Sequence, residues 1–364
     1  MKPQSSYIEY RADQPLSICF GGDKVPLMQM EHLRQLDYPI SRAISYENTV
    51  DAFLMQLAVS DGLRVLRAHN NMAILLNEQG VLECEEGKWY LIFTPDCSEQ
   101  RTLPLDAPLY PVLERLYDKL ELGEVSRVRV PDRSTKTLIS GVAPFSILDE
   151  YCKSQPGGYL AVAQRIVLMG TNELFRHVPI CRYGALASAD RDEIESYHTI
   201  RALLDEYIYN YDHRAEEKYP KPISIAVFGP PGSGKSFGVR QIAKSRGRYA
   251  ISSLNLSQYG SVSELFVAVH QAMQCGPDKI PLVFFDEFDS ELNGVSRGWL
   301  KYFLAPMQDG EYTLDGCQYP VQGAVFVFAG GTASSFKNFL PGDDPEKVAA
   351  FRAVKGPDFV SRLK

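Results

Sequence analysis

The chain has 364 residues, of which 45% are hydrophobic, 23% charged and 11% aromatic. This composition excludes general intrinsic disorder, and no apolar run approaches the roughly 18 residues that a membrane-spanning helix needs. With 38 Lys and Arg against 45 Asp and Glu, the formal net charge is −7, which is the opposite sign to that of a broad nucleic-acid-binding surface.

The N-terminal sequence and the cysteines indicate a cytoplasmic protein. The first residues, MKPQSSYIEYRADQ, are polar and lack the apolar segment of a secretion signal. The 7 cysteines are scattered and none forms a C-x-x-C pair, which favours reduced thiols over a metal cluster or a disulfide framework. We therefore expect a cytoplasmic location and no membrane partner, and nucleic acid is not indicated.

Residues 1–187 are predicted to form a mixed α/β domain of unknown role. The pattern predicts, in chain order, a short apolar run at 16–20 before Gly21-Gly22, a helix at 49–59, strands at 72–76 and 89–93 with a turn at 85–87, a helix at 112–122, a strand at 127–130 and a helix at 159–167.

Residues 188–222 are predicted to be a connecting helix and linker. Apolar side chains recur at helical spacing from residue 190 to residue 211. The segment EEKYPKP at 216–222 then ends the helix. From Ile223 onward the pattern becomes apolar strand, glycine-rich turn and helix, so residues 223–364 are expected to form a separate α/β domain.

The clearest motif in the chain follows the apolar strand at 223–228. The next residues are Gly229-Pro230-Pro231-Gly232-Ser233-Gly234-Lys235-Ser236, which satisfy G-x-x-x-x-G-K-[ST] between a strand and a helix. The glycines allow backbone N–H groups to approach phosphates closely, at the positive end of the following helix. Lys235 should reach the β- and γ-phosphates of ATP and Ser236 should ligate Mg²⁺. We count Phe237, the next residue, with this ATP-binding segment.

A second motif ends the apolar run at 282–285. It continues as Asp286-Glu287, the pattern called Walker B, at the strand end where ligands sit in open α/β sheets. Asp286 should hold the Mg²⁺ shell and Glu287 should orient and deprotonate the attacking water. A water-activating Glu favours hydrolysis over transfer of phosphate to a substrate. For Asp289 a supporting role beside the metal and a solvent-facing or capping role both remain open.

Residues 223–364 resemble the AAA+ ATPases, and Clp-type cores most nearly. Beyond the two motifs, LAPMQDGEYTLDG at 304–316 looks like the helix end and hairpin that follow Walker B, and GAVFVFAGGT at 323–332 reads as the next core strand. The resemblance implies a P-loop NTPase domain of three αβα layers with a parallel sheet. It places Thr332 as sensor 1, and Arg362 in GPDFVSRLK as the arginine finger that reaches a neighbouring subunit's nucleotide.

Some parts of the family pattern are missing from the sequence. The chain stops two residues after Arg362, so the small helical lid with sensor 2 is expected to be absent. The stretch before Walker B has no Gly-aromatic-Val-Gly pore loop, with Tyr259-Gly260 the nearest candidate, and the GAFTGA loop of transcription activators is absent as well.

The sequence therefore predicts a Mg²⁺-dependent ATPase that converts ATP to ADP and phosphate. The resemblance implies a homo-oligomer, such as a hexameric ring, that remodels an unknown protein partner. The alternative is a slowly hydrolysing nucleotide-dependent switch in signalling or defence. A non-catalytic scaffold is disfavoured because Lys235, Ser236, Asp286 and Glu287 are all intact.

Overall fold

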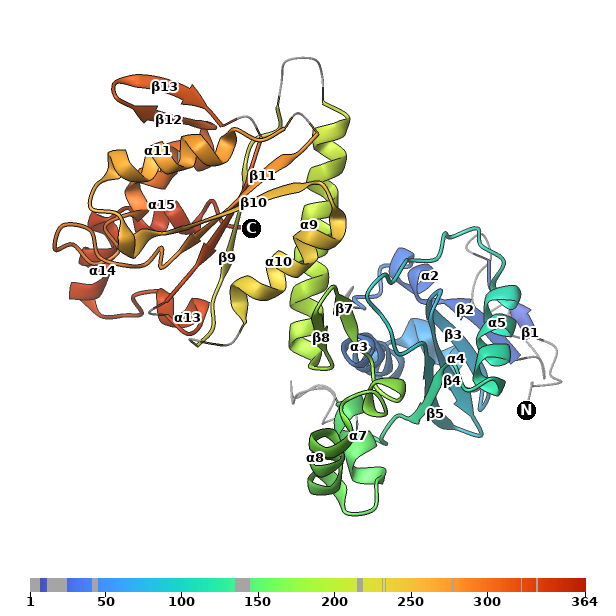
Figure 1. Ribbon diagram of the computed structural model, residues 1–364. Helices are drawn as coiled ribbons and strands as arrows, with labels where there is room; N and C mark the ends of the chain where they lie inside the picture. The colour runs from blue at the N-terminus through green and yellow to red at the C-terminus, as the bar shows by residue number, and fades with distance from the viewer. Residues whose placement is uncertain are drawn as a thin grey trace. The chain divides into compact units, whose positions relative to one another are not determined.

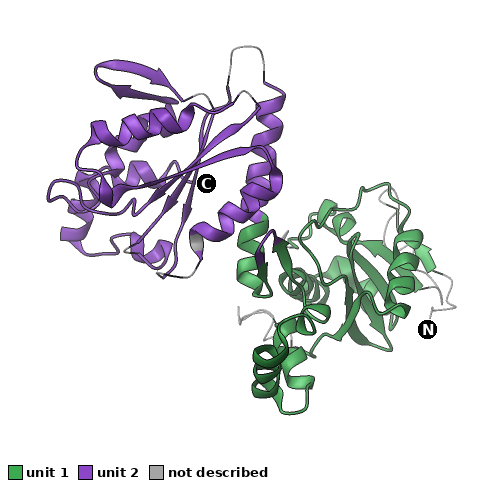
Figure 2. Ribbon diagram, viewed as in Figure 1, with its two compact units in different colours: residues 1–182, 187–198 green, residues 183–186, 199–364 purple. Residues whose placement is uncertain are grey.

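The computed structural model describes residues 7–11, 25–40, 45–134, 145–214, 219–230, 232, 234–276, 278–321, 323–331 and 333–364. The chain divides into two compact units (Figure 2). The N-terminal unit comprises Met1–Arg182 and Ala187–His198, and the C-terminal unit comprises Tyr183–Leu186 and Thr199–Lys364. None of the described helices has the length and hydrophobicity needed to cross a bilayer.

A six-stranded sheet forms the centre of the N-terminal unit. Its strands lie in chain order: β1 (Tyr7–Glu9), β2 (Val25–Gln29), β3 (Met72–Asn77), β4 (Gly80–Glu85), β5 (Lys88–Phe93) and β6 (Ser126–Arg129). The first three strands are parallel, and β3 to β6 are antiparallel neighbours. Glu86 and Gly87, both with positive φ, make the two-residue turn between β4 and β5, as the sequence predicts.

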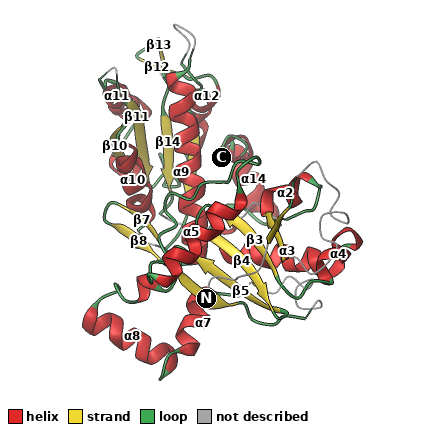
Figure 3. Cartoon of the chain, turned by 90° about the vertical axis from the view of Figure 1, so that its right-hand side faces the viewer, coloured by secondary structure: helices red, strands yellow, loops and turns green. Residues whose placement is uncertain are grey.

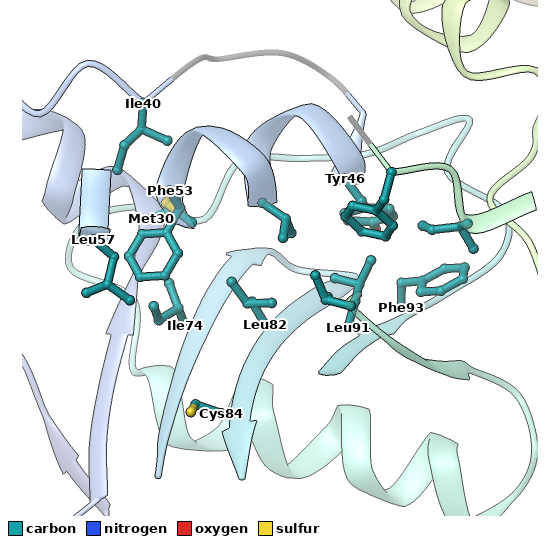
Figure 4. Packing of buried hydrophobic residues seen from close by; sticks show 14 of the residues in the cluster. Met30, Ile40, Tyr46, Phe53, Leu57, Ile74, Leu82, Cys84, Leu91 and Phe93 are labelled. Atoms are coloured by element: carbon teal, nitrogen blue, oxygen red, sulfur yellow. The ribbon is translucent and has the colours of Figure 1, made fainter. Parts of the chain in front are cut away.

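Both faces of this sheet are covered, because successive side chains of a strand point to opposite faces. Figure 4 shows Phe53 and Leu57 of α3 (Tyr46–Val59) beside Ile74, Leu82 and Leu91 of the sheet. The intervening strand residues pack against α5 (Leu109–Glu121) instead. The other helices are α2 (Met30–Gln35), η1 (Asp61–Leu63), α4 (Arg64–Arg67), α7 (Ile147–Ser154), α8 (Gly158–Met169) and η2 (Leu174–Arg176).

The predicted elements of this region are confirmed where the structure describes them. The helices predicted at 49–59, 112–122 and 159–167 correspond to α3, α5 and α8, and the strands predicted at 72–76, 89–93 and 127–130 correspond to β3, β5 and β6. The apolar run at 16–20 and Gly21-Gly22 lie outside the described residues.

A hairpin and one long helix join the two units in sequence. The hairpin consists of β7 (Cys181–Tyr183) and β8 (Leu186–Ser188), and the helix is α9 (Arg191–Asp212), close to the predicted 190–211. The division between the units falls inside α9, after His198. The later part of α9 belongs to the C-terminal unit, where the Leu204 carbonyl accepts a hydrogen bond from the Tyr249 hydroxyl at 2.7 Å.

The C-terminal unit is built on a four-stranded parallel sheet in the order β10-β11-β14-β9. The strands are β9 (Ile223–Val227), β10 (Tyr249–Asn255), β11 (Ile280–Asp286) and β14 (Val325–Ala329), and β12 (Glu311–Leu314) pairs with β13 (Cys317–Pro320) in a separate hairpin (Figure 3). The helices are α10 (Lys235–Arg246), η3 (Leu256–Gln258), α11 (Val262–Met273), η4 (Leu300–Phe303), α12 (Leu304–Gln308), α13 (Phe336–Phe339), α14 (Pro345–Ala353) and α15 (Gly356–Val360).

The sheet lies between two layers of helices (Figure 1). On one side are α10 and the later part of α9, and on the other are α11, α14 and α15. Successive side chains of β11 point to opposite faces of the sheet and so pack against both helix layers. Phe284 lies under the Arg240 guanidinium of α10, while Phe285 and Phe328 belong to a core shared with α11 and α15. The predicted three-layer αβα domain with a parallel sheet is confirmed.

Candidate functional site

Three strands deliver the candidate site to one edge of the sheet. Because β9, β11 and β14 are parallel, their carboxyl ends meet, and Val227, Asp286 and Ala329 lie in register across them. The residues that follow these three are Phe228, Glu287 and Gly330, so the phosphate loop, Walker B and the loop after β14 all begin at the same level of the sheet.

The phosphate loop ends at Gly234, the N-cap residue of α10. Gly232 and Gly234 have φ of +79° and +78°, a left-handed conformation that favours glycine, and an added Cβ at either would contact nothing. Glycine is therefore favoured at these positions by the left-handed backbone conformation, and not because neighbouring atoms would clash with a side chain. The loop ends at the amino end of α10, where free N–H groups and the helix dipole favour an anion.

Pro231, Ser233 and the side chain of Lys235 lie outside the described part of the chain. Gly229 is buried, Pro230 is exposed, and Phe237 is 44% exposed on the first turn of α10.

Ser236 and Asp286 come together as their proposed shared function requires. The Ser236 hydroxyl donates a hydrogen bond to Oδ1 of Asp286 at 3.1 Å. A hydroxyl and a carboxylate are oxygen ligands of the kind that Mg²⁺ takes, together with water and phosphate oxygens. Among the described residues no group of three or more His, Cys, Asp or Glu side chains could hold a metal ion. The Ser236 hydroxyl and the Asp286 carboxylate could supply two oxygen ligands to such an ion.

Arg240 is a site residue that the sequence analysis missed. It lies one helical turn after Ser236, with Nη2 3.7 Å from Oδ2 of Asp286. Its guanidinium lies 4.1 Å from the centroid of the Phe284 ring, and it also donates to the Ser253 hydroxyl on β10. The sequence around Arg240 does not predict a role in the site, because its contact residues lie on β10 and β11, far from it in the chain.

Glu287 begins the turn after β11 with a φ of +57°. Such a conformation is unusual for a residue with a side chain and is held by the surrounding structure. The next residue, Phe288, is fully buried, with its ring 5.6 Å from those of Phe328 and Phe359. This anchor fixes the turn, and Glu287 is left half-buried at the sheet edge.

Asp289 is buried, which rules out the solvent-facing role. It is 3% exposed, and its two carboxylate oxygens accept hydrogen bonds from the backbone N–H groups of Gly331 (2.9 Å) and Ala333 (3.2 Å). Asp289 therefore supports the loop after β14. Thr332, which the resemblance places as sensor 1, lies between these two residues in the chain and outside the described residues.

Arg362 lies on the turn after α15. Its guanidinium donates to the Gln308 side chain of α12 and to the Asp358 carbonyl of its own turn. Gln308 and Asp358 belong to the same unit as Arg362.

Comparisons with known proteins agree with this reading of the C-terminal unit. Residues 225–337 match the family model described as ATPase family associated with various cellular activities (AAA). The matched segment includes both nucleotide-binding motifs and β14, and it ends before Arg362. A search of curated proteins found no match.

Among solved structures, the S. cerevisiae Hsp104–ADP complex is similar at 15% sequence identity and a TM-score of 0.29. The match covers 63% of this chain and 38% of that one. The chain thus spans well under half of that relative, and the fold assignment rests on the sheet order and the family match.

Proposed function

We propose that the chain binds ATP and hydrolyses it to ADP and phosphate, a proposal supported by the match of residues 225–337 to the AAA ATPase family model. The observation that carries this proposal is the 3.1 Å hydrogen bond between Ser236 and Asp286, with Glu287 as the next residue. A hydroxyl and two carboxylate side chains thus lie at the sheet edge where the phosphate loop begins. That combination suits attack by water on a terminal phosphate.

Binding is assigned to the loop between β9 and α10. The backbone N–H groups of residues 229–235 and the amino end of α10 would receive the phosphates, and Lys235 would pair with the β- and γ-phosphates. Ser236 and Asp286 would hold Mg²⁺, which supplies positive charge against the phosphate oxygens when it is bound. Arg240 of α10 has Nη2 3.7 Å from Oδ2 of Asp286, so its positive charge competes with Mg²⁺ for that carboxylate.

Hydrolysis is assigned to Glu287. Its carboxylate accepts a proton from water while the water oxygen forms a bond to the γ-phosphorus and the bond from that phosphorus to the ADP oxygen breaks. Thr332 would position the water as sensor 1. Arg362 of a neighbouring subunit would offset the charge that develops on the γ-phosphate.

In its wider form, the proposal is that the chain forms a homo-oligomer, such as a hexameric ring, and remodels a protein partner in the cytoplasm. It is supported by the resemblance of GPDFVSRLK to the family's finger segment, and by the separate fold of the N-terminal unit, which could receive a partner. The alternative is a nucleotide-dependent switch in signalling or defence that hydrolyses slowly.

The test is the ATP hydrolysis rate per subunit, measured against protein concentration with Mg²⁺ for the wild type and Glu287→Gln. A rate that rises with concentration and is lost in the variant supports an assembly-dependent ATPase. Tight ATP binding with negligible turnover at every concentration favours the switch. Absence of ATP binding refutes both forms of the proposal.

A further inference from the structure

The loop after β14 is fitted to the side chain of Glu287. A Cβ added at Gly331 would lie inside the van der Waals radii of the Glu287 carboxylate atoms. The φ of Gly331 is not in the left-handed range, so its backbone does not demand glycine. The carboxylate of Glu287 thus lies directly over the backbone of the loop, in space that residue 331 leaves free because it has no side chain.

Asp289 binds the backbone of the same loop. Its buried carboxylate binds the N–H groups of Gly331 and Ala333, one with each oxygen. Hydrogen bonds to a charged acceptor are stronger than neutral ones, and a pair fixes orientation as well as distance. A side chain two residues from Glu287 therefore sets the position of the backbone on which the Glu287 carboxylate rests.

Neighbouring contacts hold this arrangement in place. The Gly330 N–H donates to the Val227 carbonyl at 3.3 Å, which ties the loop to the end of β9. Burial lowers the pKa of Arg297, and the charge of Asp289 acts against that shift; the Arg297 guanidinium rests over the Phe339 ring at 4.9 Å from the centroid.

We propose that Asp289 and Gly331 are positioning residues that fix the Glu287 carboxylate against the loop after β14. Asp289 fixes the two amides on either side of position 332, and Gly331 provides the space that the carboxylate occupies. The same two residues thus determine the position of the general base and of the loop that contains residue 332. This inference rests on the proposed hydrolysis, in which Glu287 takes the proton from water.

Gly331→Ala is the main test. The three atoms nearest to the added methyl belong to the end of the flexible Glu287 side chain, so folding should be preserved while the carboxylate is displaced. We expect nucleotide affinity and melting temperature to stay close to wild type, and kcat to fall by about 100-fold, the scale of a lost general base. The control is Gly276→Ala, at an exposed glycine where an added Cβ meets nothing within 4 Å; it should leave all three quantities unchanged.

A double variant separates positioning from a general structural role. In a Glu287→Gln background the carboxylate that Gly331→Ala displaces is already gone, so the second change should reduce kcat little further. Asp289→Asn replaces one accepting oxygen by an NH₂ group that faces a donor. It should lower kcat more than nucleotide affinity, whether or not it also lowers the melting temperature.

The outcomes distinguish this inference from the proposed function. A wild type without turnover, or a Glu287→Gln variant as active as wild type, overturns the proposed role of Glu287 in ATP hydrolysis and this inference with it. An active wild type that depends on Glu287 but is unaffected by Gly331→Ala overturns this inference alone. It is also overturned if Gly331→Ala weakens nucleotide binding as much as kcat, or multiplies the loss caused by Glu287→Gln.

Discussion

The packing of α15 predicts a large stability loss for Phe359→Ala. Phe359 is 0% exposed, and its ring stacks on Phe288 at 5.6 Å and meets the Phe328 ring edge-on at 4.9 Å. Burial of a Phe side chain stabilises by about 1.5–3 kcal/mol, and each aromatic pair adds about 0.5–1.5 kcal/mol. Together these agree with the roughly 3–5 kcal/mol measured for buried Phe→Ala changes.

This loss is large compared with the stability of a typical domain. Domains are stable by about 5–15 kcal/mol, and a loss of 1 kcal/mol lowers the melting temperature of a 150–250-residue domain by about 2–4 °C. A fall of about 10 °C is therefore expected for the C-terminal unit. The protein has 2 tryptophans, and Trp299 is fully buried in this unit. Its fluorescence in a Trp89→Phe background can follow the unfolding of the C-terminal unit.

Phe336→Ala is the matched control for Phe359→Ala. Phe336 loses the same atoms but is 45% exposed, so its cost should be about 1 kcal/mol or less. If Phe359→Ala costs less than about 1 kcal/mol, or no more than Phe336→Ala, the packing argument for α15 is wrong. Below its melting temperature, Phe359→Ala should still bind nucleotide but hydrolyse it slowly, because Arg362 depends on α15 for its place.

The other predictions concern single charges. Lys235→Ala should abolish binding of a fluorescent ATP analogue while the melting temperature of the nucleotide-free protein stays unchanged; retained affinity would contradict its role. Arg362→Ala should bind ATP but not hydrolyse it, and mixing it with Glu287→Gln subunits should restore part of the activity if the arginine acts on a neighbour, whereas mixed oligomers without recovery would exclude that role. Arg240→Met should lower the Mg²⁺ concentration for half-maximal activity up to about fivefold, because the arginine charge lies 3.7 Å from Asp286 and such partly exposed pairs are worth about 1 kcal/mol or less; an increase would show that Arg240 assists the metal. Burial raises the pKa of Glu47 by more than backbone hydrogen bonds and the charge of Arg191 lower it. The protonated Glu47 side chain therefore contributes to folding stability at low pH, and this contribution is lost as the pH rises through the raised pKa. Glu47→Gln should remove that part of the decline, seen as a gain in hydrogen-exchange protection of the N-terminal unit over wild type at about pH 8 but not at about pH 4, which is below the ordinary pKa of a Glu side chain, and an equal effect at both would contradict the assignment.

The sequence by itself determined the elements and motifs whose causes are local. A phosphate loop needs glycines at particular positions between a strand and a helix, and residues 229–236 have glycines at those positions. The alternation of apolar strands and helices predicted the layers of the C-terminal domain, and the run that ends in Asp286-Glu287 predicted a metal ligand and a base at a strand end. In the N-terminal unit, the same periodicity predicted α3 and the strands it covers.

Only the tertiary structure decided what depends on strand order. β14 lies between β11 and β9, and this order brings the loop after β14 onto Walker B. From the sequence, Asp289 was equally compatible with solvent, and neither Arg240 nor Gly331 stood out. Their partners come from distant segments: the amides after β14 for Asp289, a carboxylate on β11 for Arg240, and the Glu287 side chain for Gly331. Local pattern specifies which element a residue joins, but hydrogen bonds and packing between elements depend on the three-dimensional arrangement of strands, which no short stretch of sequence contains.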